Sequence, residues 1–545
     1  MSRFVNAVVT VGLWSPVVFG QPIVPTGELP LSVAESSEFT KTATFDEVWE
    51  WLRRLQSLGA QIHVTTVGTT TEGRSMPLVI ASRPLVTTPE QAWASGKPIL
   101  YLQGNIHGGE VEGKDALLML LRDLTLGDAR DLLDDVIVLS NPIYNADGNE
   151  KWGPVAENRR SQDGPGLVGL RPNGMGLDLN RDYIKAESPE MRSSLAGIFN
   201  RWWPDLVMDL HTTNGSYHAF DLTYAASLTP IALSGPVALA NDELLPELER
   251  RLAANEHPIF DYGNFNREYP PTEWRTFSWE PRFGTNYLGL RGAISILSES
   301  VSYRPFRTRL SATYWLVRET IAYAGANADE ITSVTRGSRD QVTAWGREPD
   351  NAPALGVRFE LASRGKETLS YEILDPPPIP GESRGTRTGR YADAELEIMT
   401  VFRATKTRPF PAGYLIPPAF PEAVTLLRRH GIGGDRLESK WSGTVRVFRV
   451  ETISAAENLF QGHRALTVDG DYRSEAREVP AGWYFVPTSQ PLGILVFTLL
   501  EPEMLDGLTS WNYFDRGLTA DQDAPVLKLM STPRVARTRL PPDVE

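Results

Sequence analysis

The sequence contains no cysteine among its 545 residues. This absence excludes disulfide bonds, thiolate zinc sites, iron–sulfur clusters and cysteine nucleophiles. A metal ion would therefore depend on histidine and carboxylate ligands. A nucleophile would have to be serine, threonine, lysine, a carboxylate or an activated water molecule.

The chain also lacks an excess of basic charge, and it lacks long apolar runs after its N-terminus. Its formal net charge of −14 argues against a nucleic-acid-binding protein, which would show a concentrated basic face. No later segment reaches the roughly 18 consecutive apolar residues of a membrane span, so the mature chain should have no integral membrane segment. With 41% apolar and 22% charged residues, the composition is that of a globular protein, and the length indicates more than one domain.

The N-terminal segment reads MSRFVNAVVTVGLWSPVVFG. One arginine precedes an apolar stretch that is broken by Pro16 and ends in Val18-Phe-Gly20. This pattern is typical of a secretory signal peptide over residues 1–20, cleaved before Gln21, and it predicts a secreted or periplasmic protein. The alternative is a buried N-terminal strand.

Residues 21–330 alternate between short apolar strands and helical patterns. Thr44-Phe-Asp-Glu47 is a capping box that starts one helix. The segments IHVTTVG and SMPLVIAS predict a hairpin. Further strands are expected in PILYLQG, DVIVLSNP, DLVMDLH and GAISILSES, and further helices over 112–124, 188–201, 236–254 and 306–327. This alternation predicts an α/β fold with a mixed, mostly parallel sheet and helices on both faces.

Residues 331–545 have a different sequence pattern. The runs GVRFELAS, TVRVFRVETI, GWYFVPTS and PLGILVFTLL alternate or are rich in β-branched residues, and DPPPIPG is a stiff loop or boundary. We expect a β-rich accessory region with one helix in PEAVTLLRRHG.

Histidine and glutamate residues stand at the ends of three of the expected strands. His107 and Glu110 follow the first strand, His211 ends the second and Glu299 lies at the end of the third. In an open α/β sheet, ligands bind beyond the carboxyl ends of the strands, so these side chains should converge. The glycines at 108 and 109 allow the tight loop that brings residues i and i+3 to one ion.

The chemistry of this set is that of a hydrolytic metal site. His107, Glu110 and His211 form a His₂Glu set, which binds one zinc ion and leaves a position for water. Glu299 is the strand-end carboxylate that does not bind the metal, and it would take the proton of the zinc-bound water. Asp178 is a candidate to hold one histidine ring through its other nitrogen.

Two loop segments, ENRRSQDG and GLDLNRDY, place further donors at the same edge of the sheet. Arg160, Asn180 and Arg181 offer guanidinium and amide groups, which suit a carboxylate because the guanidinium donors are planar and bidentate. For Arg159 and Arg171 we favour solvated loop positions.

Five motifs together resemble the zinc metallocarboxypeptidases of the carboxypeptidase A type: HGGE, NPIYNADG, GLDLNRDY, DLHTTNG and ISILSES. The resemblance covers about residues 45–330 and implies a carboxypeptidase-like fold, one zinc ion and a peptide substrate with a free C-terminus. It further implies the following roles: zinc ligands His107, Glu110 and His211; general base Glu299; Arg160 polarising the scissile carbonyl; Asn180 and Arg181 holding the terminal carboxylate; and Asp178 behind the first histidine.

The sequence departs from the family pattern at the tyrosine that covers the substrate, and the C-terminal region lies outside the resemblance. Family members usually carry a mobile tyrosine about twenty residues before the glutamate, and that spacing falls near Phe277 here. Tyr287 is the nearest substitute and is assigned to substrate binding.

Two other functions fit parts of the same pattern. A deacylase of the aspartoacylase and succinylglutamate desuccinylase kind would share the His-x-x-Glu motif, the Asn-Arg pair and the strand-end histidine. A non-catalytic carbohydrate- or peptide-binding protein on the same fold would fit the 14 tryptophans and the β-rich second half. The N-terminal segment favours the peptidase, and the complete set of ligands and Glu299 argues against a non-catalytic protein.

Overall fold

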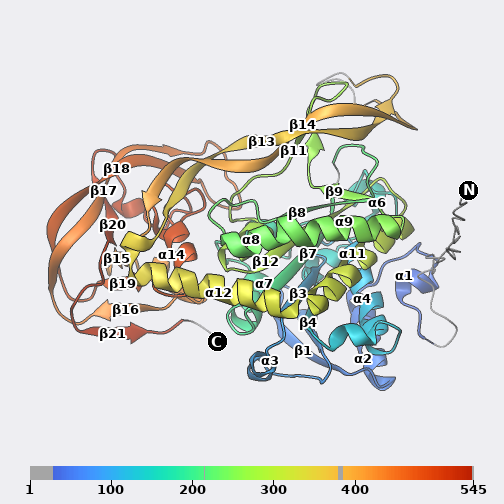
Figure 1. Ribbon diagram of the computed structural model, residues 1–545, viewed down its shortest axis with the longest axis horizontal. Helices are drawn as coiled ribbons and strands as arrows, with labels where there is room; N and C mark the ends of the chain where they lie inside the picture. The colour runs from blue at the N-terminus through green and yellow to red at the C-terminus, as the bar shows by residue number, and fades with distance from the viewer. Residues whose placement is uncertain (1–28, 214, 379–384, 543–545) are drawn as a thin grey trace, which may run out of the picture.

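The computed structural model describes residues 29–213, 215–378 and 385–542, so the expected signal peptide lies outside the described residues. A central sheet of eight strands confirms the expected mixed α/β architecture (Figure 1). The four middle strands run parallel, and the expected N-terminal hairpin forms one edge. In spatial order the strands are β1 (Ile62–Thr69), β2 (Ser75–Ala81), β4 (Ile137–Asn141), β3 (Ile99–Gly104), β7 (Leu206–Thr213), β12 (Ile294–Val301), β8 (Leu222–Ala226) and β9 (Ile259–Asp261).

Helices cover both faces of this sheet because its strands are apolar on both sides. Leu100 and Leu102 belong to the hydrophobic cluster on one face, whereas Ile99 and Tyr101 belong to the cluster on the other. The first face packs against α2 (Phe45–Ser57), α4 (Glu112–Thr125), α9 (Leu245–Ala254) and α11 (Phe306–Ala326). The second face packs against α7 (Pro189–Ser194), α10 (Gly284–Leu290) and α14 (Gly493–Leu500).

Two of the expected helices are interrupted by π-helical turns. The helix expected over 236–254 consists of α8 (Ser234–Ala238), a π-helical segment over Leu239–Leu244, and α9. The helix expected over 188–201 consists of α7 followed by a π-helical segment over Leu195–Phe199. The capping box of α2 forms as expected, since Thr44 and Glu47 each accept a hydrogen bond from the other's backbone N–H.

The second half of the chain is β-rich, as expected. A long hairpin of β13 (Ala354–Leu374) and β14 (Arg387–Pro409) extends from it across the first half, where β14 pairs with β11 (Glu273–Arg275) and β11 with β10 (Asn264–Phe265) (Figure 1). A second sheet of seven strands is antiparallel, in the order β18 (Leu466–Val479), β17 (Trp441–Ala455), β20 (Asp523–Leu529), β15 (Gly413–Ile416), β19 (Tyr484–Pro487), β16 (Gly434–Leu437) and β21 (Arg537–Leu540). The expected helix is α13 (Pro421–Arg429).

The two halves share one hydrophobic core. The expected boundary after residue 330 falls inside helix α12 (Ala328–Arg347), which leads from the first half into the second (Figure 1). The cluster on the second face of the central sheet includes Tyr101 and Val207 from the first half and Val342, Phe497 and Val526 from α12 and beyond. Within the described ranges, no helix combines the length and the hydropathy that crossing a bilayer requires.

An ion pair also joins the two halves. Nε2 of His463 lies 2.7 Å from Oε1 of Glu187, which raises the pKa of the imidazole and contributes to holding the pKa of the carboxyl at about 2. Burial opposes the shift of Glu187, and Lys185 assists it. Both side chains are partly exposed, so solvent screening limits the pair to about 1 kcal/mol or less.

The pH dependence of this contribution follows from the two pKa shifts. The imidazole stabilises the folded state below its usual pKa of 6.5, and its contribution is lost as the pH rises through the raised value. The carboxylate contributes above its usual pKa of 4.5, and its contribution is lost as the pH falls toward 2. The difference in free energy of unfolding between wild type and His463→Gln should therefore be largest between these two usual values and shrink toward alkaline pH. Chemical denaturation across pH measures it, and a constant difference would contradict the pairing.

Candidate active site

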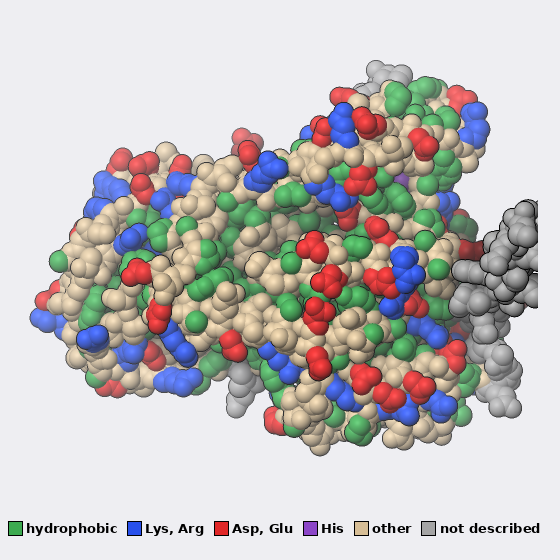
Figure 2. Space-filling view, viewed as in Figure 1, with side chains coloured by type: hydrophobic (Ala, Val, Ile, Leu, Met, Phe, Trp, Pro, Cys, Tyr) green, Lys and Arg blue, Asp and Glu red, His purple; other side chains and the backbone are tan. Residues whose placement is uncertain are grey.

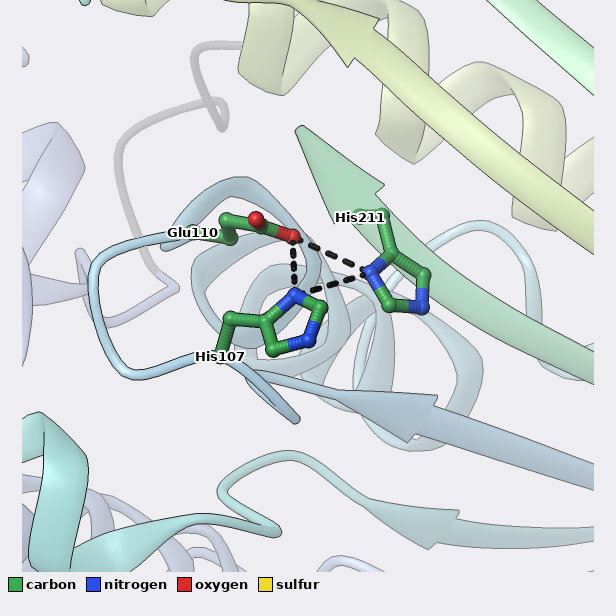
Figure 3. A group of neighbouring side chains, drawn as sticks. All are labelled: His107, Glu110 and His211. Carbon is green, nitrogen blue, oxygen red and sulfur yellow. Dashed lines mark hydrogen bonds and ion pairs between the residues drawn. The ribbon is translucent and has the colours of Figure 1, made fainter. Parts of the chain in front are cut away.

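Two histidines and one glutamate converge beyond the central strands (Figure 3). Nδ1 of His107 lies 3.0 Å from Oε2 of Glu110 and 3.3 Å from Nδ1 of His211. Nδ1 of His211 lies 3.0 Å from the same glutamate oxygen. All three side chains are buried. The structure thus brings together the three residues that the sequence indicated as metal ligands.

The spacing of these atoms fits a tetrahedral ion. Ligands at 2.0–2.1 Å from a tetrahedral zinc stand about 3.3 Å apart, close to the three observed separations. Two imidazoles and one carboxylate are also the donor types that such a site requires when thiolates are absent. The residues present therefore fit a single zinc ion.

The loop after β3 is shaped to present His107 and Glu110 together. Asn105 has a left-handed backbone (φ 62°), and its side-chain amide donates to the carbonyl oxygens of His107, Gly108 and Glu110 at 3.0–3.3 Å. A Cβ on Gly108 would lie 2.2 Å from the backbone carbon of Gly148. The glycine is therefore required by close packing of two loops, beyond the flexibility that the sequence indicated.

Glu299 stands beside His211 because their strands are parallel and in register. The two residues are direct partners between β12 and β7, so their side chains lie on the same face. Burial raises the pKa of Glu299 to about 8, with a further contribution from Glu110, against opposing effects of His211 and two arginines. Among the described residues its carboxylate has no hydrogen-bond donor, which leaves both oxygens open to the cavity.

On each histidine ring, the nitrogen that points away from the three-residue cluster lies near a carboxylate. Nε2 of His107 lies 3.0 Å from Oδ1 of Asp178, as expected from the sequence. Nε2 of His211 lies 2.9 Å from Oδ2 of Asp209. Sequence reasoning missed Asp209, although its place two residues before His211 on one strand puts both on the same face. Such carboxylates fix the ring orientation of metal-binding histidines.

A cavity of about 310 Å³ opens over this cluster, and its lining includes two arginines for which the sequence predicts solvated positions. Arg159 is buried and donates to Glu110 at 3.0 Å and to the carbonyl oxygen of Thr212 at 2.6 Å. Arg171 donates to Asp178 at 2.9 Å while 42% of its side chain stays exposed. The predicted solvated position is wrong for Arg159, which is buried. Arg171 keeps part of its side chain in solvent and also pairs with Asp178 and Glu110.

Arg160, the residue chosen from the sequence, is exposed and does not line the cavity. After the short helix α6 (Val155–Asn158), adjacent side chains point to different sides of the backbone, and Arg159 takes the inward position. The assignment of Arg160 is therefore corrected.

Asn180 and Arg181 both line the cavity. The side-chain oxygen of Asn180 accepts a hydrogen bond from the backbone N–H of Gly284 at 2.9 Å. The side-chain NH₂ of Asn180 therefore stays available to a ligand. The guanidinium of Arg181 lies 4.2 Å from the ring centre of Phe283, and burial lowers its pKa. We call Asn180 and Arg181 the donor pair.

Tyr287 does not reach the cavity, which corrects its assignment to substrate binding. It lies in α10 with no exposed surface, and its hydroxyl is 2.8 Å from Nδ1 of His430. The tyrosine that lines the cavity is Tyr262, whose ring packs edge-on against Phe277 at 5.7 Å. Tyr262 follows the short strand β9, and the sequence spacing gave no signal for it.

A larger cavity of about 690 Å³ lies between α8, α9 and the β13–β14 hairpin. It shares the residue Tyr262 with the cavity over the histidines, but it contains none of the three clustered ligands. The chemistry of the lining residues, not cavity size, therefore identifies the active site.

Comparison with known families decides which class of hydrolase this cluster serves. Residues 48–203 match the family model described as zinc carboxypeptidase. This match agrees with the resemblance to zinc carboxypeptidases that the five sequence motifs indicated. The expected enzyme class, a zinc metallocarboxypeptidase, is thereby confirmed.

Curated carboxypeptidases resemble nearly the whole chain. Carboxypeptidase 2 of Trichophyton equinum is 25% identical over 526 residues, which cover 90% of this chain and 88% of the relative. Carboxypeptidase 2 of Trichophyton rubrum gives the same identity and coverage. Since the similarity covers 90% of the chain, it extends from the carboxypeptidase domain into the β-rich half.

Solved carboxypeptidase structures match about half of the chain. A metallo-carboxypeptidase from Burkholderia cenocepacia is 18% identical, covering 52% of this chain and 69% of that one, with a TM-score of 0.37. Carboxypeptidase A from Helicoverpa armigera is also 18% identical, covering 53% and 75%, with a TM-score of 0.38.

Proposed function

We propose that this protein is a zinc carboxypeptidase that releases single residues from the free C-termini of peptides. One observation carries the proposal: the donor pair lines the same cavity as Glu299 and the three clustered metal ligands. Groups for binding a carboxylate and groups for hydrolysis therefore face one substrate-sized space.

His107, Glu110 and His211 would hold the single zinc ion. A zinc ion bound there supplies a Lewis acid and lowers the pKa of water. Asp178 and Asp209 keep the two rings oriented. Glu299 accepts the proton of the attacking water and returns it to the departing amine, which is the task of a general base and acid.

Arg171 is the residue that we propose to polarise the scissile carbonyl, in place of Arg160. Its side chain is 42% exposed and faces the cavity, whereas that of Arg159 is 7% exposed and its donors already bind Glu110, Thr212 and Gln162. Arg171 also pairs with Asp178 and Glu110, but its guanidinium is partly exposed and lines the cavity beside the metal ligands, where it can stabilise charge that develops on a carbonyl oxygen.

The rest of the cavity wall indicates the preferred C-terminal side chain. Phe277, Phe283 and Leu297 line it together with Tyr262 and Thr285. Apart from the donor pair and the groups around the metal ligands, this lining carries no charge. We propose a preference for peptides that end in an aromatic or large aliphatic residue.

Mass spectrometry of peptide products tests the proposal. A peptide with a free C-terminal Phe should lose that residue first, and a peptide that ends in Asp should react more slowly. Removal of metal with a chelator should abolish the reaction, and one equivalent of zinc should restore it. Cleavage at internal bonds, or activity that persists without metal, would contradict this function.

The two alternatives make different predictions. A deacylase would hydrolyse N-acyl amino acids in preference to peptides, and a binding protein would retain peptides without releasing a product. The full set of ligands and the open carboxylate of Glu299 support hydrolysis over binding alone.

On the face shown in Figure 2, acidic and basic side chains are interspersed.

Export to the periplasm or the exterior is also part of the proposal, and it rests on the N-terminal segment. Mass spectrometry of the protein from its native cell should then find an N-terminus near Gln21. An intact Met1 would favour the deacylase.

A further inference from the structure

One loop of the β-rich half lies against the segment that carries the donor pair. The side-chain oxygen of Gln461 accepts a hydrogen bond from the backbone N–H of Asp178 at 3.0 Å, although the two residues are 283 positions apart. Two residues further along, His463 pairs with Glu187. The β-rich half thus contacts the same loop on both sides of Asn180 and Arg181.

A stronger contact fixes Arg282, which precedes the ring that lies under Arg181. One carboxylate oxygen of Asp506 accepts hydrogen bonds from the backbone N–H of Arg282 at 3.0 Å and from its Nε at 2.9 Å. Nη2 of Arg282 lies 2.7 Å from the other carboxylate oxygen. The side chain of Asp506 has no exposed surface. The rings of Phe460 and Trp511 lie 5.0 and 5.4 Å from the guanidinium. Arg282 is therefore held by three residues of the β-rich half.

The two residues after Arg282 contact the donor pair directly. The ring of Phe283 lies under the guanidinium of Arg181, 4.2 Å from its central carbon. The backbone N–H of Gly284 donates to the side-chain oxygen of Asn180 at 2.9 Å. A shift of the 282–284 segment would therefore move both members of the donor pair.

We propose that the β-rich half forms part of the substrate-binding apparatus, with Asp506 as a positioning residue that sets the donor pair through Arg282. This inference rests on the proposed role of Asn180 and Arg181 in binding a terminal carboxylate. It gives the second half of the chain a function in the reaction, beyond that of an accessory region. His107 and Glu110 stand in the loop after β3, and His211 and Glu299 stand on β7 and β12, so all four lie outside the 282–284 segment.

Replacement of Asp506 by Asn tests the proposal. The amide keeps the size of the side chain but loses the charge that holds Arg282, so the donor pair should lose its alignment with the carboxylate. We expect KM for a peptide with a free C-terminus to rise about tenfold while kcat changes by less than about twofold, since the lost interaction binds ground state and transition state alike. The preference for free over amidated peptide should fall by a similar factor, and zinc content should stay at that of wild type.

Glu503→Gln is the matched control. Glu503 is equally buried, lies three residues before Asp506, and pairs with Lys406 and with Arg408 at 2.7 Å on the β13–β14 hairpin, away from the donor pair. Both variants should lower the melting temperature, but only Asp506→Asn should raise KM. Phe460→Leu removes one of the rings that pack against Arg282, and it should also raise KM, by a smaller factor. This variant replaces Asp506→Asn as the test if Asp506→Asn does not fold.

The outcomes separate the two proposals. If wild type shows no preference for a free C-terminus, the proposed function fails. If wild type has that preference and the Asp506 and Phe460 variants keep the wild-type KM, only the positioning role fails. A loss of kcat in proportion to the loss of folded protein, with unchanged KM, would assign Asp506 to stability alone.

Discussion

Replacement of Glu299 by Gln should lower kcat by about 10²–10⁴ while the bound zinc stays at the level of wild type. The amide keeps the size of the side chain but cannot accept a proton from the attacking water. His107, Glu110 and His211 do not depend on Glu299 for a hydrogen bond, so the metal site should remain intact. KM should change little, because the lost step is chemical.

Elemental analysis and steady-state kinetics on the same preparations measure this effect. Glu249→Gln is a suitable control, since Glu249 lines the larger cavity, where it accepts the hydroxyl hydrogen of Tyr224. That variant should keep wild-type turnover. Near-wild-type kcat in Glu299→Gln would assign proton transfer to another group.

Amidation of a peptide's C-terminus should lower kcat/KM by roughly 10²-fold or more, and Arg181→Ala should remove most of that difference. A free carboxylate forms charged hydrogen bonds with the guanidinium and with the amide of Asn180, worth about 1.5–3 kcal/mol. An amide offers only a neutral oxygen and leaves the half-buried guanidinium of Arg181 without an anionic partner from the substrate. A site built for a polar partner rejects analogues that lack it.

One peptide in two forms, assayed with wild type and variant, gives the required ratios. Arg160→Ala is the matched control, because Arg160 is an exposed arginine of the same domain that does not line the cavity. It should behave as wild type. Equal hydrolysis of both peptide forms by wild type would show that the donor pair does not bind a terminal carboxylate, and the protein would then be an endopeptidase or amidase.

The grouping of the three candidate metal ligands could be predicted from the sequence because it depends on local rules. His107, His211 and Glu299 each follow or end an apolar run, and the carboxyl ends of parallel strands meet at one edge of a sheet. Two strands run slightly past the expected positions, since β7 continues beyond His211 to Thr213 and β12 continues beyond Glu299 to Val301.

The arginines and the tyrosine could not be assigned in the same way. Arg159 and Arg160 are adjacent in a loop, and only the backbone path after α6 decides which one faces inward. Tyr287 is helical and points to His430, a residue of the second half. Contacts between halves, such as Gln461 with Asp178, leave no periodic signal in the sequence because they join segments hundreds of residues apart.

The shared hydrophobic core has a consequence for how the protein is made. The first face of the central sheet is covered by helices that are complete once α11 and the start of α12 have been synthesised. The second face, with Tyr101 and Val207, also needs apolar residues from α14 and from Val526. At about 5–20 residues per second, a ribosome requires roughly ten to forty seconds to add the chain that follows α12. During that interval the nascent chain exposes part of an apolar sheet face, so chaperones should bind the half-made protein there, before the peptidase can act on any peptide.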